Sequence, residues 1–166
     1  MKYLIALIIS LSIFILSCKD SILEDTNPSI MTDTLECKLN GETWKPQGGG
    51  FGEPTIDVYY SNIFGRLLVD GDNNTGNGIE SVTISSNLEY TGEFPLLPGG
   101  SPLFGFLDCG LYHYLDTLSE HKVIITKFDK EAKIIQGEFF FTAINPDCLD
   151  TIIVTDGRFN ATYRED

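Results

Sequence analysis

Positive charge is scarce in this sequence of 166 residues, which holds 11 lysines and arginines against 24 aspartates and glutamates, for a formal net charge of −13. Proteins that bind nucleic acid neutralise its phosphates with lysine and arginine, and docking to anionic lipid headgroups also needs basic clusters. The composition therefore argues against a nucleic-acid partner and against direct binding to an anionic membrane surface. The excess of acidic residues favours solubility.

Histidine and the recognised catalytic motifs are also sparse. The two histidines, His113 and His121, occur without an HExxH pattern, and no GxSxG sequence is present. We therefore predict that the protein is not an enzyme and has no cofactor or metal. Because carboxylates are plentiful, the alternative is a hydrolase that acts on envelope or extracellular glycans through two carboxyl groups about 5 to 9.5 Å apart.

Long hydrophobic runs are absent after the first twenty residues. The N-terminus itself has Lys2, an apolar stretch over residues 4–16, and then Ser17 and Cys18, which is the order of an export signal. The apolar stretch is shorter than the roughly 20 residues that a membrane-spanning helix needs. We therefore interpret residues 1–17 as a signal peptide that is removed.

The sequence that ends this signal is Ile15-Leu16-Ser17-Cys18. It resembles the lipobox of bacterial lipoproteins, whose cysteine is lipidated and becomes the new N-terminus. The resemblance implies a lipid on Cys18 and a bacterial cell-envelope protein anchored to the outer membrane, on the periplasmic side or exposed at the surface. Several acyl chains make a stable anchor, since each buried methylene contributes about 0.8 kcal/mol. An ordinary secretory peptide is the alternative, and residues 18–33 are polar enough to form a flexible tether.

Four cysteines become three if Cys18 carries lipid. The oxidising compartment outside the inner membrane then allows one disulfide. Cys109 and Cys148 stand in turn-like sequences, whereas Cys37 alternates with leucines on an apolar face. We therefore predict a Cys109–Cys148 disulfide and a buried Cys37 that acts as a small hydrophobic residue. A metal site built from the three is disfavoured, because no CxxC spacing is present.

From residue 34 onward, short runs of β-branched and aromatic residues are separated by Gly, Pro, Asn or Asp, which is typical of strands and turns. Residues 135–143 alternate most clearly, with Ile, Gly, Phe, Phe and Ala on one face. Asn40-Gly41 predicts a tight hairpin turn, and Asp156-Gly157 predicts a second turn. Because no helical stripe of useful length is present, we predict one all-β domain over residues 34–166, an antiparallel β-sandwich or partly closed barrel of about eight to ten short strands.

This domain contains several short motifs in a fixed order. An early Asn-Gly is followed by an aromatic residue. Later, a strand ends in an aromatic residue and Asp, and Gly-x-Phe-x-Phe and a closing Asp-Gly-x-Phe follow it. The residues that form them are Asn40, Gly41, Trp44, Phe128, Asp129, Gly137, Phe139, Phe141, Asp156, Gly157 and Phe159. The combination resembles a family of small lipid-anchored or secreted β proteins of Bacteroidota that are known only as domains of unknown function. The resemblance implies a β-sandwich located in the cell envelope, and it brings no catalytic residues.

Asp70, Asp72 and Asn74 fall at alternate positions in a polar stretch, and their oxygens are ligands that calcium prefers. An EF-hand loop would need Gly where Thr75 stands and Glu where Ser81 stands. We therefore interpret the stretch as a polar hairpin loop, with calcium binding as the alternative, and predict no metal site.

Two tyrosines are the remaining candidates for ligand binding. On a strand, Tyr112 and Tyr114 share one face and His113 takes the other, so the two rings could stack on a sugar or an aromatic ligand. Trp44, the single tryptophan, is a third candidate, and packing in the core is the alternative for the two tyrosines. These features together predict a cell-envelope lipoprotein with a tethered binding or structural module. Its ligand would be a protein or a glycan, and it would contact the membrane through its N-terminal lipid only.

Overall fold

The computed structural model describes residues 32–47, 55–74, 79–98, 103–104 and 112–166. Twelve strands in this part of the chain form two sheets, so the predicted all-β class is confirmed, with more strands than the eight to ten expected. The hydrogen bonds between described residues leave two separate sheets and do not close a barrel. A search of the same residues finds no helix with the length and apolar character needed to cross a membrane.

The first sheet has the order β2-β1-β11-β10-β9-β6, and β8 also pairs with β10. Every pair in it is antiparallel. Its strands are β1 (Thr34–Leu39), β2 (Glu42–Trp44), β6 (Gly92–Phe94), β8 (Tyr114–Leu115), β9 (Lys122–Asp129), β10 (Ile134–Ile144) and β11 (Thr151–Thr162).

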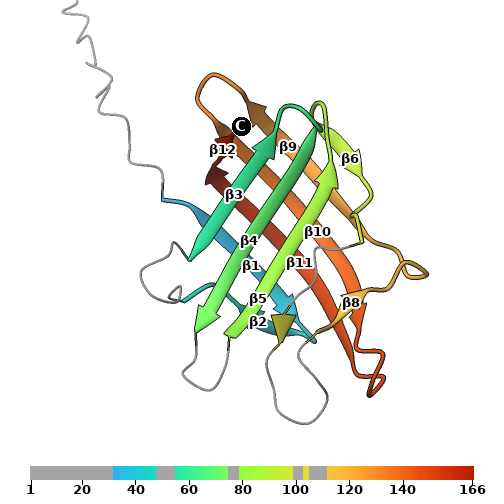
Figure 1. Cartoon of the computed structure of the whole chain (residues 1–166). Coiled ribbons are helices and arrows are strands. Elements are labelled where there is room, and N and C mark those ends of the chain that lie inside the picture. The colour runs from blue at the N-terminus through green and yellow to red at the C-terminus, as the bar shows by residue number, and fades with distance from the viewer. Residues whose placement is uncertain (1–31, 48–54, 75–78, 99–102, 105–111) are drawn as a thin grey trace, which may run out of the picture.

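The second sheet has the order β12-β3-β4-β5-β7, in which β12 pairs with β3 in parallel and the other pairs are antiparallel. In Figure 1 this sheet lies in front of the first, and its strands cross those behind it. Its strands are β3 (Ile56–Ser61), β4 (Arg66–Asn74), β5 (Ile79–Asn87), β7 (Leu103–Phe104) and β12 (Arg164–Glu165).

The core lies between the sheets because each long strand alternates apolar and polar side chains. On β10 the predicted face, which includes Ile135, Phe139 and Phe141, is buried, while Glu138 on the opposite face is exposed. The second sheet contributes Leu67, Val69, Val82 and Ile84, all fully buried. Burial of each such side chain stabilises the fold by about 1.5 to 3 kcal/mol relative to exposure.

The two Gly-containing turns predicted from the sequence have different outcomes. Asn40 and Gly41 have φ values of 50° and 89° and join β1 to β2 in a tight hairpin, as predicted. The prediction for Asp156-Gly157 is wrong, because both residues lie inside β11. Asp156 has a φ of 51° and forms a β-bulge, where β11 has one residue more than its neighbours β1 and β10.

This bulge explains why a positive φ and a glycine adjoin within a strand. A Cβ atom on Gly157 would lie 2.5 Å from the ring of Phe139, which is itself 2% exposed. Glycine therefore allows the Phe139 ring to pack directly against the β11 backbone. The apparent turn signal marks a bend in a continuous strand instead of its end.

An aromatic cluster marks the place where the chain changes sheets. Tyr163 lies between β11 of the first sheet and β12 of the second, and its ring centroid is 5.9 Å from that of Tyr60 and 5.6 Å from that of Phe128. The Nζ atom of Lys130 lies 5.2 Å from the centroid of the Phe128 ring, so a cation–π contact covers the cluster. This corner holds β12 and the residue after it, Asp166, against β3.

Candidate functional site

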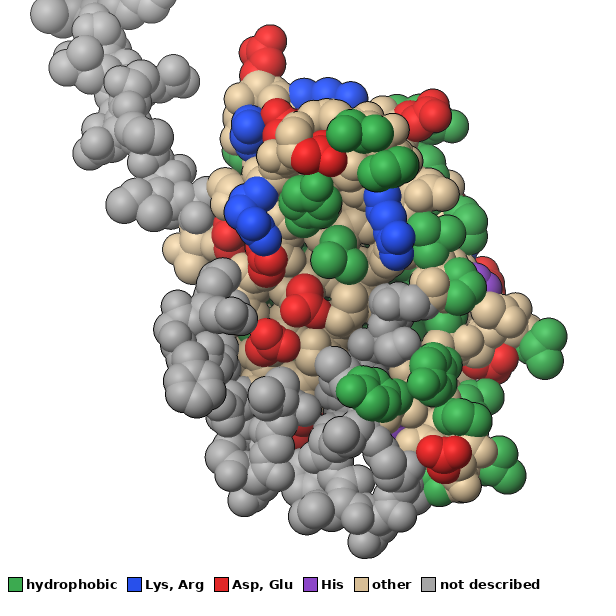
Figure 2. Space-filling view, viewed as in Figure 1, with side chains coloured by type: hydrophobic (Ala, Val, Ile, Leu, Met, Phe, Trp, Pro, Cys, Tyr) green, Lys and Arg blue, Asp and Glu red, His purple; other side chains and the backbone are tan. Residues whose placement is uncertain are grey.

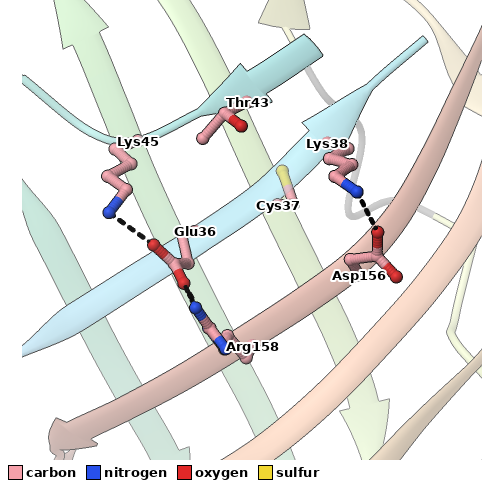
Figure 3. Close-up of a pocket in the computed structure, with 7 residues that line it drawn as sticks. All are labelled: Glu36, Cys37, Lys38, Thr43, Lys45, Asp156 and Arg158. Atoms are coloured by element: carbon pink, nitrogen blue, oxygen red, sulfur yellow. Dashed lines mark hydrogen bonds and ion pairs between the residues drawn. The ribbon is translucent and has the colours of Figure 1, made fainter. Parts of the chain in front are cut away.

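A charged hollow of about 320 Å³ lies on the outer face of β2, β1 and β11. Figure 3 shows Lys45 and Arg158 directed at the carboxylate of Glu36 from the two sides, and Lys38 directed at Asp156. The Lys45 Nζ atom is 2.5 Å from Glu36 Oε2, and the Lys38 Nζ atom is 2.8 Å from Asp156 Oδ2. Alternation along β1 sends Glu36 and Lys38 outward, so the hollow is a set of cross-strand ion pairs.

The pKa shifts of Glu36 and Cys37 describe the chemistry of this hollow. Lys45 and then Arg158 lower the pKa of Glu36 below its ordinary value, so this carboxylate is ionised. Cys37 points into the core and is 2% exposed, as the sequence predicted. Burial raises the pKa of its thiol to about 12, so it is not a nucleophile at neutral pH.

The predicted tyrosine pair lies on the outer face of the first sheet. Tyr112 and Tyr114 are 51% and 53% exposed, and His113 between them is 4% exposed, so the predicted alternation is confirmed. Tyr114 stands directly opposite Ile144 of β10. The two rings therefore face solvent from a segment that is hydrogen-bonded into the sheet.

The turn between β10 and β11 supports this segment and adds apolar surface. The His113 Nε2 atom is 3.3 Å from Asp150 Oδ2, which links the segment to the turn. Leu149 in the turn is 78% exposed, and Ile153 of β11 is 52% exposed. Figure 2 shows hydrophobic side chains along the right-hand edge, where β8 and this turn lie in Figure 1. We call the surface formed by Tyr112, Tyr114, Ile144, Leu149 and Ile153 the tyrosine face.

Trp44, the third predicted ligand-binding residue, does not belong to this surface. It is 5% exposed, and its Nε1 atom donates a hydrogen bond of 3.3 Å to Glu80 Oε2 of β5. Trp44 therefore packs in the core between the two sheets, which corrects its place among the ligand-binding candidates.

The calcium candidates lie on a strand, whereas the sequence predicted a loop. Asp70, Asp72 and Asn74 belong to β4, whose pairing with β5 continues to the end of the strand. These three residues therefore do not lie in the loop on which the calcium interpretation depended. Asp70 Oδ1 instead accepts hydrogen bonds from Ser81 Oγ (3.1 Å) and Thr83 Oγ1 (2.5 Å).

Burial, together with the negative charges of Asp72 and Asp57, raises the pKa of Asp70 above its ordinary value. Within the described ranges, no group of three or more histidine, cysteine, aspartate or glutamate residues is arranged to hold a metal ion.

Two predicted cysteine roles involve residues outside the described part of the chain. Cys18, the lipidation candidate, and Cys109, one half of the predicted disulfide, both lie there. The two cysteines that are described, Cys37 and Cys148, are not joined to each other. The Cys109–Cys148 disulfide and the lipid on Cys18 thus remain predictions.

A second hollow, of about 410 Å³, was not anticipated from the sequence. It lies on the outer face of the five-stranded sheet near the β3–β4 hairpin, and its lining residues are Tyr59, Ser61, Phe64, Arg66, Leu68 and Asp166. The signal available in the sequence was the alternation of polar and apolar residues along β3 and β4. That alternation identifies the outward side chains but not which of them meet across the strands.

Comparisons with protein-family models, with curated proteins and with solved structures found no significant match. The fold thus defines the class of the molecule, an all-β protein of two packed sheets. The resemblance to the Bacteroidota family remains a prediction.

Proposed function

We propose that the protein is a binding module of the bacterial cell envelope, anchored by a lipid on Cys18, and that its tyrosine face binds a glycan. The polar residues 18–33 serve as the tether between the anchor and the folded domain. The signal-like N-terminus and the family resemblance support the envelope location. The observation that supports binding is the exposed pair Tyr112 and Tyr114 on a sheet-bonded segment.

Physical reasons favour a sugar ring as the ligand of this face. Aromatic side chains gain most from burial, and two exposed rings on one face are an unused binding surface. Alternate strand positions place the rings about 7 Å apart, and the contact between His113 and Asp150 limits their movement. A rigid pair of phenol rings offers an apolar surface for a sugar and hydroxyl groups for its rim.

The test is binding of the protein to a panel of envelope and plant polysaccharides, measured by affinity electrophoresis. We expect the double variant Y112A/Y114A to bind its best polysaccharide about five- to 150-fold more weakly, because each ring contact contributes about 0.5 to 1.5 kcal/mol. The matched control is Y90A, since Tyr90 is 65% exposed but lies elsewhere, beside Phe94. Equal loss in Y90A, or no loss in the double variant, contradicts the assignment of the tyrosine face.

Lipidation is tested separately by metabolic labelling with radioactive palmitate. We expect the wild-type chain to incorporate label and remain with membranes, and C18S to do neither. Label in C18S, or membrane association that does not depend on Cys18, contradicts the proposed anchor.

A hydrolase is the second candidate, and one observation favours it. Asp57 and Asp70 stand directly opposite each other on β3 and β4. The pKa of Asp70 is raised, while Asp57 is held by Arg164, with Asp57 Oδ1 3.0 Å from Arg164 Nε. Two neighbouring carboxyl groups, one of which has a raised pKa, are the arrangement that glycosidases use. Release of reducing ends from the bound polysaccharide, lost in D70N but not in Y112A/Y114A, would establish this alternative.

A further inference from the structure

Arg66 differs from the other basic residues that the structure describes. Each of the others contacts a carboxylate or an aromatic ring, namely Lys38, Lys45, Lys122, Lys127, Lys130, Lys133, Arg158 and Arg164. Within the described ranges, the side chain of Arg66 has a single hydrogen-bond partner, the hydroxyl of Ser85. In a chain with 24 acidic residues, an arginine without a carboxylate is a charge left available to an external anion.

The second hollow surrounds this guanidinium with apolar walls. Tyr59 of β3 stands opposite Leu68 of β4, and Arg66 is two residues from Leu68, so the three share the outer face of the sheet. Phe64 of the β3–β4 hairpin completes the lining and is itself 76% exposed. Figure 2, which views this face, shows hydrophobic side chains gathered at the upper end, where the hairpin lies in Figure 1.

A hydrogen bond orients the Arg66 guanidinium through its Nε atom and leaves its two terminal nitrogens available. The Arg66 Nε atom donates a bond of 3.0 Å to Ser85 Oγ, and Ser85 is 1% exposed, so the inner edge of the guanidinium is fixed. The two terminal nitrogens form the planar fork that binds a carboxylate through two parallel hydrogen bonds.

Asp166, the acidic residue that lines the same hollow, is already occupied. Its Oδ2 atom accepts a hydrogen bond of 2.8 Å from Ser61 Oγ, and its Oδ1 atom accepts one of 2.9 Å from the Asn62 backbone N–H. It also accepts a hydrogen bond from the Tyr59 hydroxyl, which raises the pKa of that phenol. Asp166 therefore holds the Tyr59 ring in the wall of the hollow and does not pair with Arg66.

We propose that this hollow binds a small aromatic carboxylate, with the carboxylate on the terminal nitrogens of Arg66 and the ring against Tyr59, Phe64 and Leu68. An apolar concave surface with one well-placed charged group is the usual form of a small-molecule site. The site is on the opposite sheet from the tyrosine face and does not depend on the proposed glycan binding.

The test is NMR titration of the full chain, purified in a nonionic detergent, with phenylacetate as the probe. The chain has three arginines, so the Arg66 Nε–Hε signal can be assigned from R66Q. We expect saturable shifts of this signal with a dissociation constant of about 1 to 10 mM, as is usual for a ligand of this size. Phenylacetamide, which has the same ring and no charge, is expected to bind about ten- to a hundredfold more weakly, because it lacks the charge-assisted hydrogen bonds.

Two variants separate the site from general effects of charge. We expect R66Q to lose the saturable binding. R158Q, which removes an arginine of the other sheet, should keep it. Both variants should still unfold cooperatively. F64A, whose side chain is exposed and whose loss leaves the core intact, should weaken binding while the Arg66 signal remains measurable. Equal binding of phenylacetate and phenylacetamide, or binding unchanged in R66Q, overturns the proposal. Sedimentation that shows a dimer of this chain lost in R66Q also overturns it, because the hollow would then be an interface between copies.

Discussion

Replacement of Gly157 by alanine tests the packing of the bulged strand against the core. The new Cβ atom would lie 2.5 Å from both Cδ2 and Cε2 of Phe139. That ring has little room to move, because its centroid is 6.3 Å from that of Phe141 and 6.4 Å from that of Phe159. Overpacking of a filled core costs about 1 to 3 kcal/mol, so we expect G157A to lower the free energy of unfolding by about 2 kcal/mol.

Thermal unfolding followed by circular dichroism measures this loss. One kcal/mol corresponds to roughly 4 °C in the melting temperature of a domain of this size, so G157A should melt about 8 °C lower than the wild type. The cause is isolated by a second substitution, F139L, which removes the ring that the Cβ atom meets. We expect the double variant G157A/F139L to lose at least about 1 kcal/mol less than the sum of the two single losses.

Gly41 supplies the matched control for this cycle. It has a φ of 89° with nothing within 4 Å of the added Cβ atom, so G41A strains the backbone and touches no side chain. Its cost, about 1 kcal/mol, should add to that of F139L without coupling. Additive losses for G157A and F139L, or an unchanged melting temperature in G157A, would refute the packing argument.

The remaining predictions concern titration and cysteine chemistry. The pKa of Glu36 is depressed in the folded state, so its ionised form stabilises the fold above pH 4.5 and this contribution is lost as the pH falls through the lower folded value. Chemical denaturation at pH 6 and pH 3 should therefore show that acid lowers the free energy of unfolding less in E36Q than in the wild type. E42Q is the control and should match the wild type, because Glu42 has no ion pair among the described residues. A thiol with a pKa of about 12 is nearly all protonated at pH 8, so Cys37 should react with iodoacetamide only upon unfolding, and rapid labelling of the native protein would contradict its burial. Peptide mapping without reductant should show Cys109 joined to Cys148, and free thiols at both positions would remove the disulfide.

The sequence was a good guide to which residues are buried and a poor guide to where strands end. Alternation alone predicted that Cys37 faces inward and that Tyr112 and Tyr114 share the face opposite to His113, because side chains of a strand alternate in direction whatever its neighbours are. It did not predict which of the two faces is exposed. Asp156-Gly157 misled because a positive φ beside glycine serves a bulge as well as a turn. Which of the two forms depends on whether partner strands continue on both sides, and that is a property of the sheet.

For the candidate sites, too, the sequence predicted some features and missed others. Trp44 was a ligand-binding candidate because of its residue type. It lies opposite Cys37 on a short strand, and its side chain is buried in the core. Arg66 was not recognised, since its significance is the absence of a carboxylate partner among the described residues. Some partners of the other basic residues come from strands far apart in sequence, as with Glu36 and Arg158. A pairing of that kind depends on cross-strand register, which alternation does not determine.

The pairing of β1 with β11 has a consequence for the order in which the chain can fold. Thr34 stands opposite Asn160, and the Asp33 carboxylate accepts a hydrogen bond from the backbone N–H of Thr162. The first strand of the domain can therefore gain its main partner only when almost the last strand has been made. Contacts of such long range make folding slow. During synthesis β1 therefore has only its hairpin partner β2 until the end of the chain is available, whereas β3, β4 and β5 can pair in the order in which they are made.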